Sequence, residues 1–305
     1  MPSRDLLLFF LIAIAWSINT VVSSYVLTPG SLTALGVPPL FFAALRFLVV
    51  ALCTAPWLFP LPERSGRMLL IALLMGCGHF GLTYVGLRDA TTASAGIVFQ
   101  TAPPLIVLLS VWMFGERLSA RRIVGICLAL SGVLLTVYTP HGLSYSTGLL
   151  FIIGGQITFA VAAVMLKTIT EISPMQFQAW TGSLSVPALF ILSGFTETAQ
   201  IPRAMDGGWI LVAIGIYSGL IASVWAHGQF YSLMQRHAGS QVATFQLLPP
   251  VMTIGLGIWL RGDPFTVRLG IGAGLALAGV FLTNFGVGRG RKPTPDEALD
   301  SNVAT

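Results

Sequence analysis

The sequence is poor in charged residues, and this shortage excludes most classes of soluble protein. Asp, Glu, Lys and Arg together make up 9% of the 305 residues, whereas a soluble domain carries about 25%. Hydrophobic residues make up 55% of the chain, and the mean hydropathy is +0.84. Because such a chain cannot cover its own surface with polar groups, the composition predicts an integral membrane protein.

Cysteines are few and their number is odd. Cys53, Cys77 and Cys127 all fall in apolar stretches, so we expect buried free thiols and neither a disulfide framework nor a metal site. The net charge of +5 does not predict a nucleic-acid partner in a chain this apolar. The expected partners are a small-molecule substrate and the lipid bilayer, and no cofactor is expected.

Ten apolar stretches are long enough to cross a bilayer, which takes roughly 20 mostly apolar residues. They lie near residues 5–25, 39–59, 68–87, 91–114, 121–138, 147–166, 175–195, 209–233, 239–260 and 268–287. The first is too long for the apolar core of a signal peptide, so we expect it to remain as the first helix. Short linkers predict an all-α bundle, and the polar residues 289–305 predict a disordered cytoplasmic tail.

Lys and Arg are distributed unequally between the two sides of such a bundle. With ten spans, eleven of the sixteen fall on the side that holds both chain termini, four fall on the other side, and Arg46 lies within a span. Basic residues concentrate in cytoplasmic loops. The distribution therefore predicts a multi-pass protein of the cytoplasmic (inner) membrane with both termini in the cytoplasm.

One pattern occurs twice, about 146 residues apart. Its members are Phe99, Gln100, Pro103 and Pro104 in the first copy and Phe245, Gln246, Pro249 and Pro250 in the second. Two modules, residues 1–140 and 141–288, would then hold five spans each. Because five is odd, the second module enters the membrane from the opposite side. Such an inverted repeat is typical of alternating-access transporters, whose substrate site lies between the repeats near the mid-plane.

Three short motifs resemble those of a known family. They are PPLFFAALRF at 38–47, FGERL at 114–118 and the stretch from Gly125 to Gly132. In order and spacing they resemble the EamA family of the drug/metabolite transporter superfamily, over essentially the whole chain as two five-helix modules. The resemblance implies ten helices in an inverted repeat and export of small metabolites such as amino acids and their derivatives.

The charged turn after each copy of the glutamine–proline pattern is a candidate gate. The second turn departs from the family pattern, because it reads Gly262-Asp263-Pro264. We therefore assign the gating role to the first turn, through Glu116 and Arg117.

The two glutamines are the leading candidates for contact with a substrate. Gln100 lies about 16 Å of helix inside its span and Gln246 about 13 Å inside its own, at 1.5 Å per residue. The proline pair after each glutamine removes two N–H donors and frees the carbonyls four residues back. We expect these amides and carbonyls to line one cavity; the alternative is that the prolines only bend the helices for packing.

A second pair of polar residues, His79 and His227, lies inside the third and eighth spans, with Tyr84 and Tyr231 nearby. Histidine within a span indicates a functional site by default, and it can take up a proton near neutral pH. The alternative is a neutral imidazole bonded to a carbonyl in a packed interface. No Asp or Glu lies deep inside a span, which disfavours a carboxylate-based proton exchanger and leaves facilitated or potential-driven export open.

Arg46 is the only basic residue inside a span, about 10 Å below the outer surface. One interpretation has it meet a substrate carboxylate in an outward-facing cavity. The other, which we prefer, is structural: Arg46 reaches outward or bonds Asp89 and helix carbonyls. Its counterpart in the second module is Thr181, so the repeat does not require the charge.

The remaining candidates are aromatic, polar or small residues. Trp16 and Asn19 form a polar patch in the first span, and in the resembling family this helix borders the central cavity. Phe99 and Phe245 add aromatic surface, which leaves aromatic substrates open. Two series of small residues predict close helix packing in a monomer or a homodimer: Gly125-x3-Ala129 and Gly270-x3-Gly274-x3-Ala278.

The sequence therefore predicts a secondary transporter that exports amino acids or their derivatives by alternating access through a central cavity. A broad-range exporter of amphiphiles or drugs is the first alternative, and a channel or a non-transporting membrane scaffold is the alternative from another class. A membrane enzyme is disfavoured because the polar groups in the spans form no nucleophile–base set, paired carboxylates or metal cluster.

Overall fold

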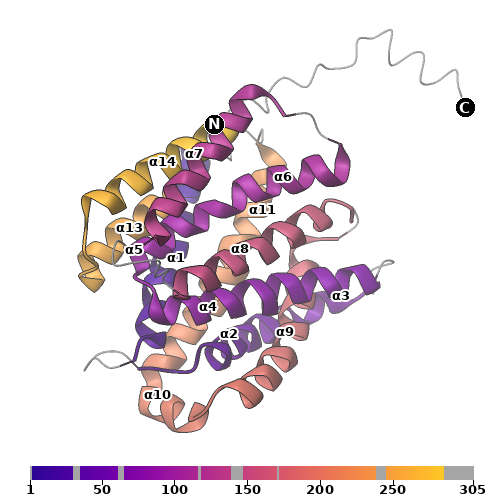
Figure 1. Ribbon diagram of the computed structural model, residues 1–305. Coiled ribbons are helices and arrows are strands. Elements are labelled where there is room, and N and C mark those ends of the chain that lie inside the picture. Colours follow the sequence, from indigo (N-terminus) through magenta and orange to yellow (C-terminus); the bar gives the residue numbers. More distant parts are fainter. Residues whose placement is uncertain are drawn as a thin grey trace, which may run out of the picture.

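Helices form every regular element in the part of the chain that the structure describes. This computed structural model describes residues 2–29, 35–60, 65–115, 118–138, 147–169, 172–237 and 245–284. The elements of the first half are α1 (Ser3–Leu27), α2 (Pro39–Thr54), η1 (Ala55–Leu58), α3 (Ser65–Leu73), η2 (Leu74–Phe80), α4 (Gly81–Asp89), α5 (Thr92–Val98), η3 (Phe99–Thr101), α6 (Ala102–Phe114) and α7 (Ala120–Val137). Those of the second half are α8 (Thr147–Leu166), α9 (Pro174–Thr196), α10 (Gln200–Ile216), η4 (Tyr217–Trp225), α11 (Ala226–Arg236), α13 (Leu248–Arg261) and α14 (Val267–Asn284) (Figure 1).

Nine helical stretches in these ranges are long and apolar enough to cross a membrane. Four of them join several elements: Pro39–Leu58 runs from α2 to η1, Gly66–Asp89 from α3 to α4, Thr92–Phe114 from α5 to α6, and Gln200–Phe230 from α10 to α11. The predicted span near 239–260 appears as the 14-residue α13, and residues 239–244 of it lie outside the described ranges. The all-α membrane fold is thus confirmed, and the count of ten spans stays a prediction.

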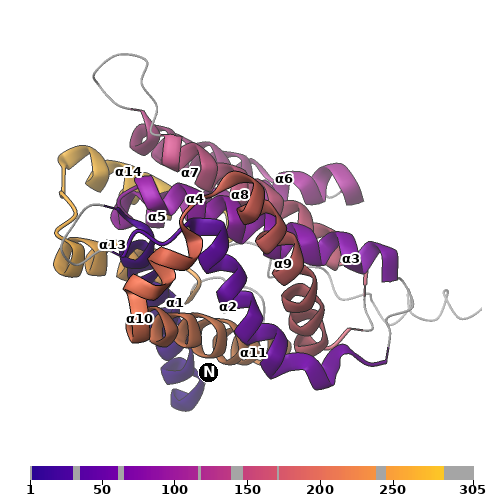
Figure 2. The same ribbon diagram turned by 90° about the horizontal axis from the view of Figure 1, so that it is seen from below.

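Helices of the first half of the chain pack against helices of the second half. The closest helix pairs are α7 with α14, α2 with α9, and α4 with α8, so each pair joins one helix from either half (Figures 1 and 2). The backbone N–H of Leu40 bonds Glu197, while Gly182 lies beside Ala51, which makes α2 and α9 antiparallel. Any cavity in the bundle centre is therefore lined by residues from both halves.

Small residues bring α7 and α14 into backbone contact. A Cβ atom on Gly132 would lie 2.5 Å from the backbone nitrogen of Ala276, and one on Gly125 would lie 2.7 Å from that of Thr283. The first predicted series, Gly125-x3-Ala129 of α7, thus packs against α14 of the same chain. The second is wrong as a packing seam, since Gly274 is exposed with nothing within 4 Å of a Cβ, and α14 packs through a neighbouring face that includes Gly279.

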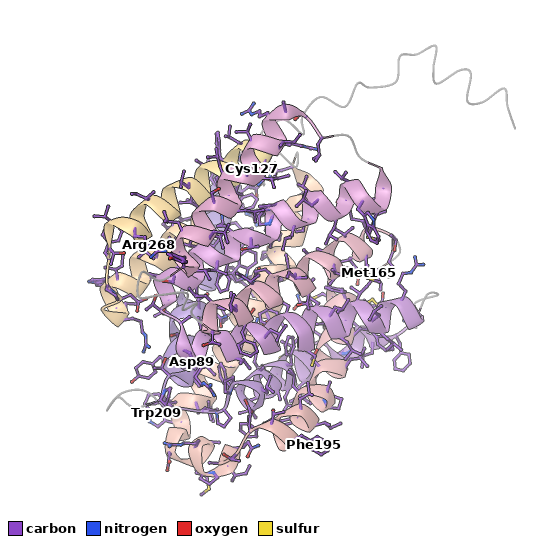
Figure 3. The ribbon with its side chains drawn as sticks, viewed as in Figure 1. Asp89, Cys127, Met165, Phe195, Trp209 and Arg268 are labelled. Carbon is purple, nitrogen blue, oxygen red and sulfur yellow. The ribbon has the colours of Figure 1, made fainter. Side chains whose placement is uncertain are left out.

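Large apolar side chains cover the outside of the bundle. Trp112, Phe195, Trp209 and Trp259 are 81%, 86%, 78% and 78% exposed, and Figure 3 shows Phe195 and Trp209 at the rim of the molecule. Tryptophans near helix ends are typical of membrane–water interfaces. The expectation that all three cysteines are buried is wrong, because Cys53 and Cys127 are exposed on surfaces that lipid would cover.

The two halves repeat several local features. The proline pair lies in the first turn of α6 and again of α13, where proline is tolerated because the first N–H groups have no intrahelical partner. Each of these helices ends at a left-handed glycine, Gly115 with φ 67° and Gly262 with φ 68°. A π-helical stretch, η2 or η4, interrupts the span of each histidine. π-helical turns occur frequently at functional sites, which directs attention to the region around His79 and His227.

Candidate functional site

A cavity of about 70 Å³ lies between the two halves of the bundle, enough for several water molecules. α2 contributes three of its lining residues, η2 three, and α9 three, while α8, η4 and α11 contribute one each. They are Arg46, Phe47, Val50, Met75, His79, Phe80, Phe159, Phe177, Gln178, Thr181, Ser223 and His227. The cavity thus combines apolar rings with a small set of polar groups, as ligand sites do.

The cavity extends from the middle of the bundle toward the end at which α9 begins. Phe177 and Thr181 lie about 5 and 10 Å along α9 from Pro174, at 1.5 Å per residue. Arg46 lies about 10 Å along α2 from Pro39, and α2 begins at the opposite end of the bundle because it is antiparallel to α9. Arg46 therefore lines the cavity nearer to the middle of the bundle than Phe177 does.

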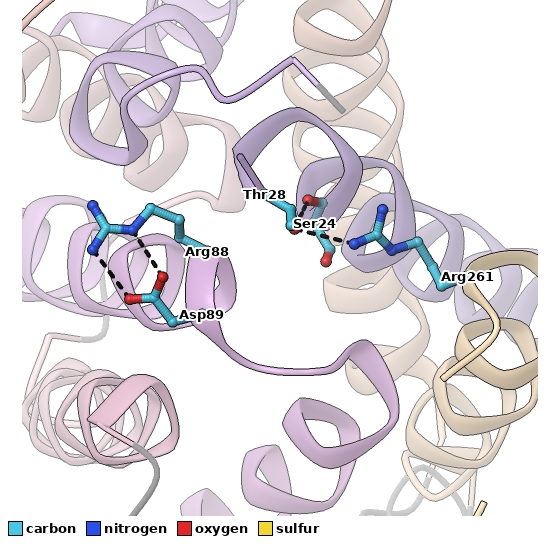
Figure 4. A network of polar contacts seen from close by, with 5 residues as sticks. All are labelled: Ser24, Thr28, Arg88, Asp89 and Arg261. Carbon is cyan, nitrogen blue, oxygen red and sulfur yellow. Dashed lines mark hydrogen bonds and ion pairs between the residues drawn. The ribbon is translucent and has the colours of Figure 1, made fainter. Parts of the chain in front are cut away.

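Arg46 is 1% exposed and is held by hydroxyl groups and a ring. Its Nε and Nη2 donate to Ser223 Oγ at 3.1 and 2.8 Å, and its Nη1 donates to Tyr84 OH at 2.8 Å. The guanidinium carbon lies 3.9 Å from the centroid of the Phe80 ring, a cation–π contact. The predicted bond to Asp89 is wrong, because Asp89 pairs with its neighbour Arg88 at 3.1 Å (Figure 4).

Tyr84 joins Arg46 to two further helical elements. The side chain is 2% exposed, Ser23 of α1 donates to its hydroxyl at 3.3 Å, and Ser218 Oγ of η4 lies at the same distance. The ring stacks on Phe42 with centroids 5.4 Å apart. A helix from each half is therefore tied to the guanidinium by one phenol group.

Both predicted histidines line the cavity, and each is bonded to a backbone carbonyl. Nδ1 of His79 lies 2.9 Å from the carbonyl oxygen of Gly155, and Nδ1 of His227 lies 2.9 Å from that of Ala222. A neutral ring in this geometry carries its proton on Nδ1 and presents Nε2 as an acceptor. These are the bonds that the structural alternative expects, and a role in proton transfer stays a prediction.

The structure places Trp16, Phe245 and Gln246 at a second, smaller cavity of about 10 Å³. Trp16 donates from Nε1 to the carbonyl of Ala222 at 3.0 Å, and its ring lies 4.9 Å from that of His227. Trp16 of the second cavity therefore contacts η4 at Ala222 and lies beside His227, which lines the first cavity. The side chain of Tyr231 lies outside the described part of the structure.

Neither of the two cavities described above is lined by both predicted glutamines. Gln100 is 5% exposed, and its Nε2 has no hydrogen-bond partner among the described residues. Neither cavity is lined by Gln100, Asn19 or Phe99, so their contact with a substrate stays a prediction. Glu116 and Arg117, the predicted gating pair, lie outside the described residues.

Several cavity residues were missing from the predicted site. Gln178 and Ser223 are polar residues inside spans, which is the signal that could have found them. Thr181 occupies the position equivalent to Arg46, and the repeat itself points to it. Phe159 and Phe177 carry no such signal, because an aromatic residue in a span is most often packing or lipid contact.

The second charged turn holds helices together outside the spans. Oδ2 of Asp263 accepts a hydrogen bond from the backbone N–H of Ala93 at 2.8 Å, and burial raises the pKa of its carboxyl. Nη2 of Arg261 donates to Thr28 Oγ1 at 3.1 Å (Figure 4). The ends of α13, α5 and α1 are thus linked at one side of the bundle.

The opposite side of the bundle is linked by an ion-pair cluster. Asp5, whose side chain is 8% exposed, has one oxygen 2.7 Å from His237 Nε2 and the other 3.6 Å from Arg236 Nη1. This joins the beginning of α1 to the end of α11. α1 is therefore bound to a different helix of the second half at each of its ends.

Comparison with known proteins gives one family over nearly the whole chain. The profile of the EamA-like transporter family matches residues 4–138 and again residues 146–285. A protein of Salmonella typhimurium named "Probable amino-acid metabolite efflux pump" is 26% identical over 298 residues, which cover 94% of this chain and 96% of the relative. A protein of Streptantibioticus cattleyicolor named "Probable terminal-alkyne amino-acid exporter" is 25% identical, over 89% of this chain and 92% of the relative.

A solved crystal structure shares the fold. It aligns over 100% of both chains with a TM-score of 0.59 and 18% sequence identity. The similarity at this level of identity concerns the arrangement of helices alone.

Proposed function

We propose that this chain, which belongs to the EamA-like transporter family, is a secondary transporter that exports amino acids or amino-acid derivatives across the cytoplasmic membrane. Transport would proceed by alternating access, with two inverted five-helix modules and both termini in the cytoplasm. The cavity around Arg46 and the two histidines would hold the substrate during the change of access.

One observation carries the proposal: a cavity with a buried guanidinium lies between the halves of the chain, among helices that are long and apolar enough to cross a membrane. Its residues come from α2 and η2 on one side and from α8, α9, η4 and α11 on the other, and these segments fall in the two separate family matches. A site between two repeats near the mid-plane is where transporters of this architecture bind substrate.

The substrate class rests on the names of the relatives. Two proteins that resemble this chain along its length are named for the efflux or export of amino-acid compounds. A buried cation suits such compounds, because they carry a carboxylate. The aromatic lining favours substrates with an apolar or aromatic side chain.

Reconstitution of the full chain in liposomes tests this function. Loaded with unlabelled substrate, the vesicles should take up the labelled compound faster than empty ones, and uptake should saturate. A screen over amino acids and their derivatives would identify the substrate. Linear, non-saturating flux without counterflow would indicate a channel, and the absence of flux for every compound would indicate a scaffold.

A further inference from the structure

The guanidinium of Arg46 has donors to spare. A guanidinium carries five N–H groups, and the described contacts of Arg46 use three of them: one on Nε, one on Nη1 and one on Nη2. One N–H on each terminal nitrogen is left without a described acceptor. Arg46 lines the larger cavity, from which a ligand would approach the guanidinium.

Among the described residues, the charge of Arg46 is also without a partner of opposite sign. In the described part of the chain no Asp or Glu oxygen lies within 4.0 Å of its nitrogens. Hydroxyl groups and the Phe80 ring solvate the charge without neutralising it. A buried ion of this kind is most stable when an opposite charge completes its shell, and the cavity is the side from which that charge can come.

The shape of the unused donors selects the ligand. Two N–H groups on the terminal nitrogens of a planar guanidinium match the two oxygens of a carboxylate. No second Arg or Lys lines the cavity among the described residues, so a single negative charge is matched better than a phosphate dianion. The neighbouring rings of Phe47, Phe80 and Phe159 can cover an apolar or aromatic remainder.

The same lining offers nothing of opposite charge to an ammonium group. The described cavity residues include two imidazoles, one carboxamide and two hydroxyls, but no Asp or Glu. A carboxylate is the usual ion-pair partner of an ammonium, so an α-amino group would meet only neutral acceptors here and would add less to binding than the carboxylate. Resting on the transport function above, we propose that Arg46 is the carboxylate subsite of the cavity and that the site requires a carboxylate but not an amine.

Three matched compounds test this on the unaltered chain in detergent. 3-Phenylpropionate carries the ring and the carboxylate, L-phenylalanine adds the amine, and phenethylamine carries the amine alone. Titration calorimetry should give similar Kd values, within about threefold, for the first two, and a Kd at least about tenfold higher for phenethylamine. Binding of phenethylamine as tight as that of 3-phenylpropionate, or no binding of 3-phenylpropionate at millimolar concentration, would overturn the proposal.

A pair of arginine variants assigns the effect to Arg46. Arg46→Lys keeps the charge and loses the paired donors, so its Kd for 3-phenylpropionate should rise by about tenfold. Arg88→Lys is the control, since the Arg88 side chain is 46% exposed and lies outside both cavities. Equal affinity in the two variants would contradict the assignment. If Arg46→Lys does not fold, the comparison of the three compounds on the unaltered chain still tests whether the site requires a carboxylate.

The outcome is separable from that of the transport test. Binding of 3-phenylpropionate in a protein that carries no compound across liposomes would sink the transporter and leave the carboxylate subsite standing. Saturable transport that is inhibited by phenethylamine but not by 3-phenylpropionate would support the transporter and overturn the carboxylate subsite.

Discussion

At the scale of single residues, the site depends on hydroxyl groups that hold a buried charge. Tyr84 OH accepts from Arg46 and from Ser23, and the Ser223 hydroxyl accepts twice from Arg46. Hydrogen bonds to a charged group contribute more to stability than bonds between neutral groups. These hydroxyls therefore stabilise the fold and also hold the guanidinium in position.

Tyr84→Phe should lower the free energy of unfolding by about 1–3 kcal/mol, because it leaves a buried charged donor without its acceptor. The ring and its stacking on Phe42 would be retained. Tyr217→Phe is the matched control: this half-buried hydroxyl donates a single bond, to the carbonyl of Ala15 at 3.0 Å, and its loss should cost about 0.5–1.5 kcal/mol. Denaturant unfolding in detergent would measure both, and an equal or larger loss for Tyr217→Phe would contradict the argument.

We expect the stability of the folded protein to depend on pH through the half-buried carboxyl of Asp263. Burial raises the pKa of its carboxyl in the folded protein above the value of about 3.9 of an unfolded chain. The folded state then binds the proton more tightly, so the contribution of Asp263 to stability falls as pH rises through this acidic range. Asp263→Asn can still accept from Ala93, and its melting temperature should change less with pH above about 4.

The control for Asp263→Asn is Asp89→Asn, which also removes a negative charge but at a side chain that is 47% exposed. Thermal unfolding from acidic to neutral pH would compare the two variants with the unaltered chain. An unchanged pH profile in Asp263→Asn would show that this carboxyl does not carry the effect.

At the scale of elements, close backbone packing and irregular helix geometry position the site. α7 and α14 approach so closely that no side chain fits at Gly132. The π-helical stretches η2 and η4 precede or include the histidine of their span and line the cavity from both halves. Regular helices in their place would turn His79 and His227 away from their present neighbours.

Two glycine substitutions test the packing of α14. Gly132→Ala should lower stability by about 1–3 kcal/mol or prevent folding, because the added methyl meets the backbone of Ala276. Gly274→Ala should be neutral or stabilising by up to about 1 kcal/mol, because nothing lies within 4 Å and alanine favours a helix. The yield and melting temperature of the purified protein would show the difference, and equal behaviour would mean that the seam is not tightly packed.

At the scale of the whole molecule, α1 is linked at its two ends to different helices of the second half. The Asp5 cluster joins it to α11 at one side, and the Thr28–Arg261 bond joins it to α13 at the other. In the proposed transport cycle, we expect one set of these links to break while the other persists, which makes the two ends of α1 candidates for the two gates.

Accessibility of single cysteines tests the proposed topology. In a chain without its three native cysteines, we would place one cysteine at Ser3, Ala120 or Ile201, all of which are exposed. With both termini in the cytoplasm, a membrane-impermeant maleimide added to whole cells should label position 201 and spare positions 3 and 120. Permeabilised cells provide the control, and labelling of position 3 in intact cells would reverse the orientation.

The features that were predictable from sequence are local ones. Length and hydropathy of each span depend on residues adjacent in the chain, and so does the proline pair in the first turn of α6 and of α13. The exposed cysteines and the seam at Gly279 rather than Gly274 were not predictable, because which face of an apolar helix meets protein and which meets lipid depends on its neighbours.

The sequence by itself determined the membrane class, the helical spans, the repeated pattern and the residues whose burial would be costly, among them Arg46, His79 and His227. Only the tertiary structure decided which of these share a cavity. Arg46 and Ser223 are 177 residues apart in the chain, and their contact follows from the packing of α2 against η4 and α9. The glutamines had the stronger repeat pattern, yet the cavity formed around the arginine, because side chains meet according to helix rotation and packing, which the spacing of residues in one helix cannot specify.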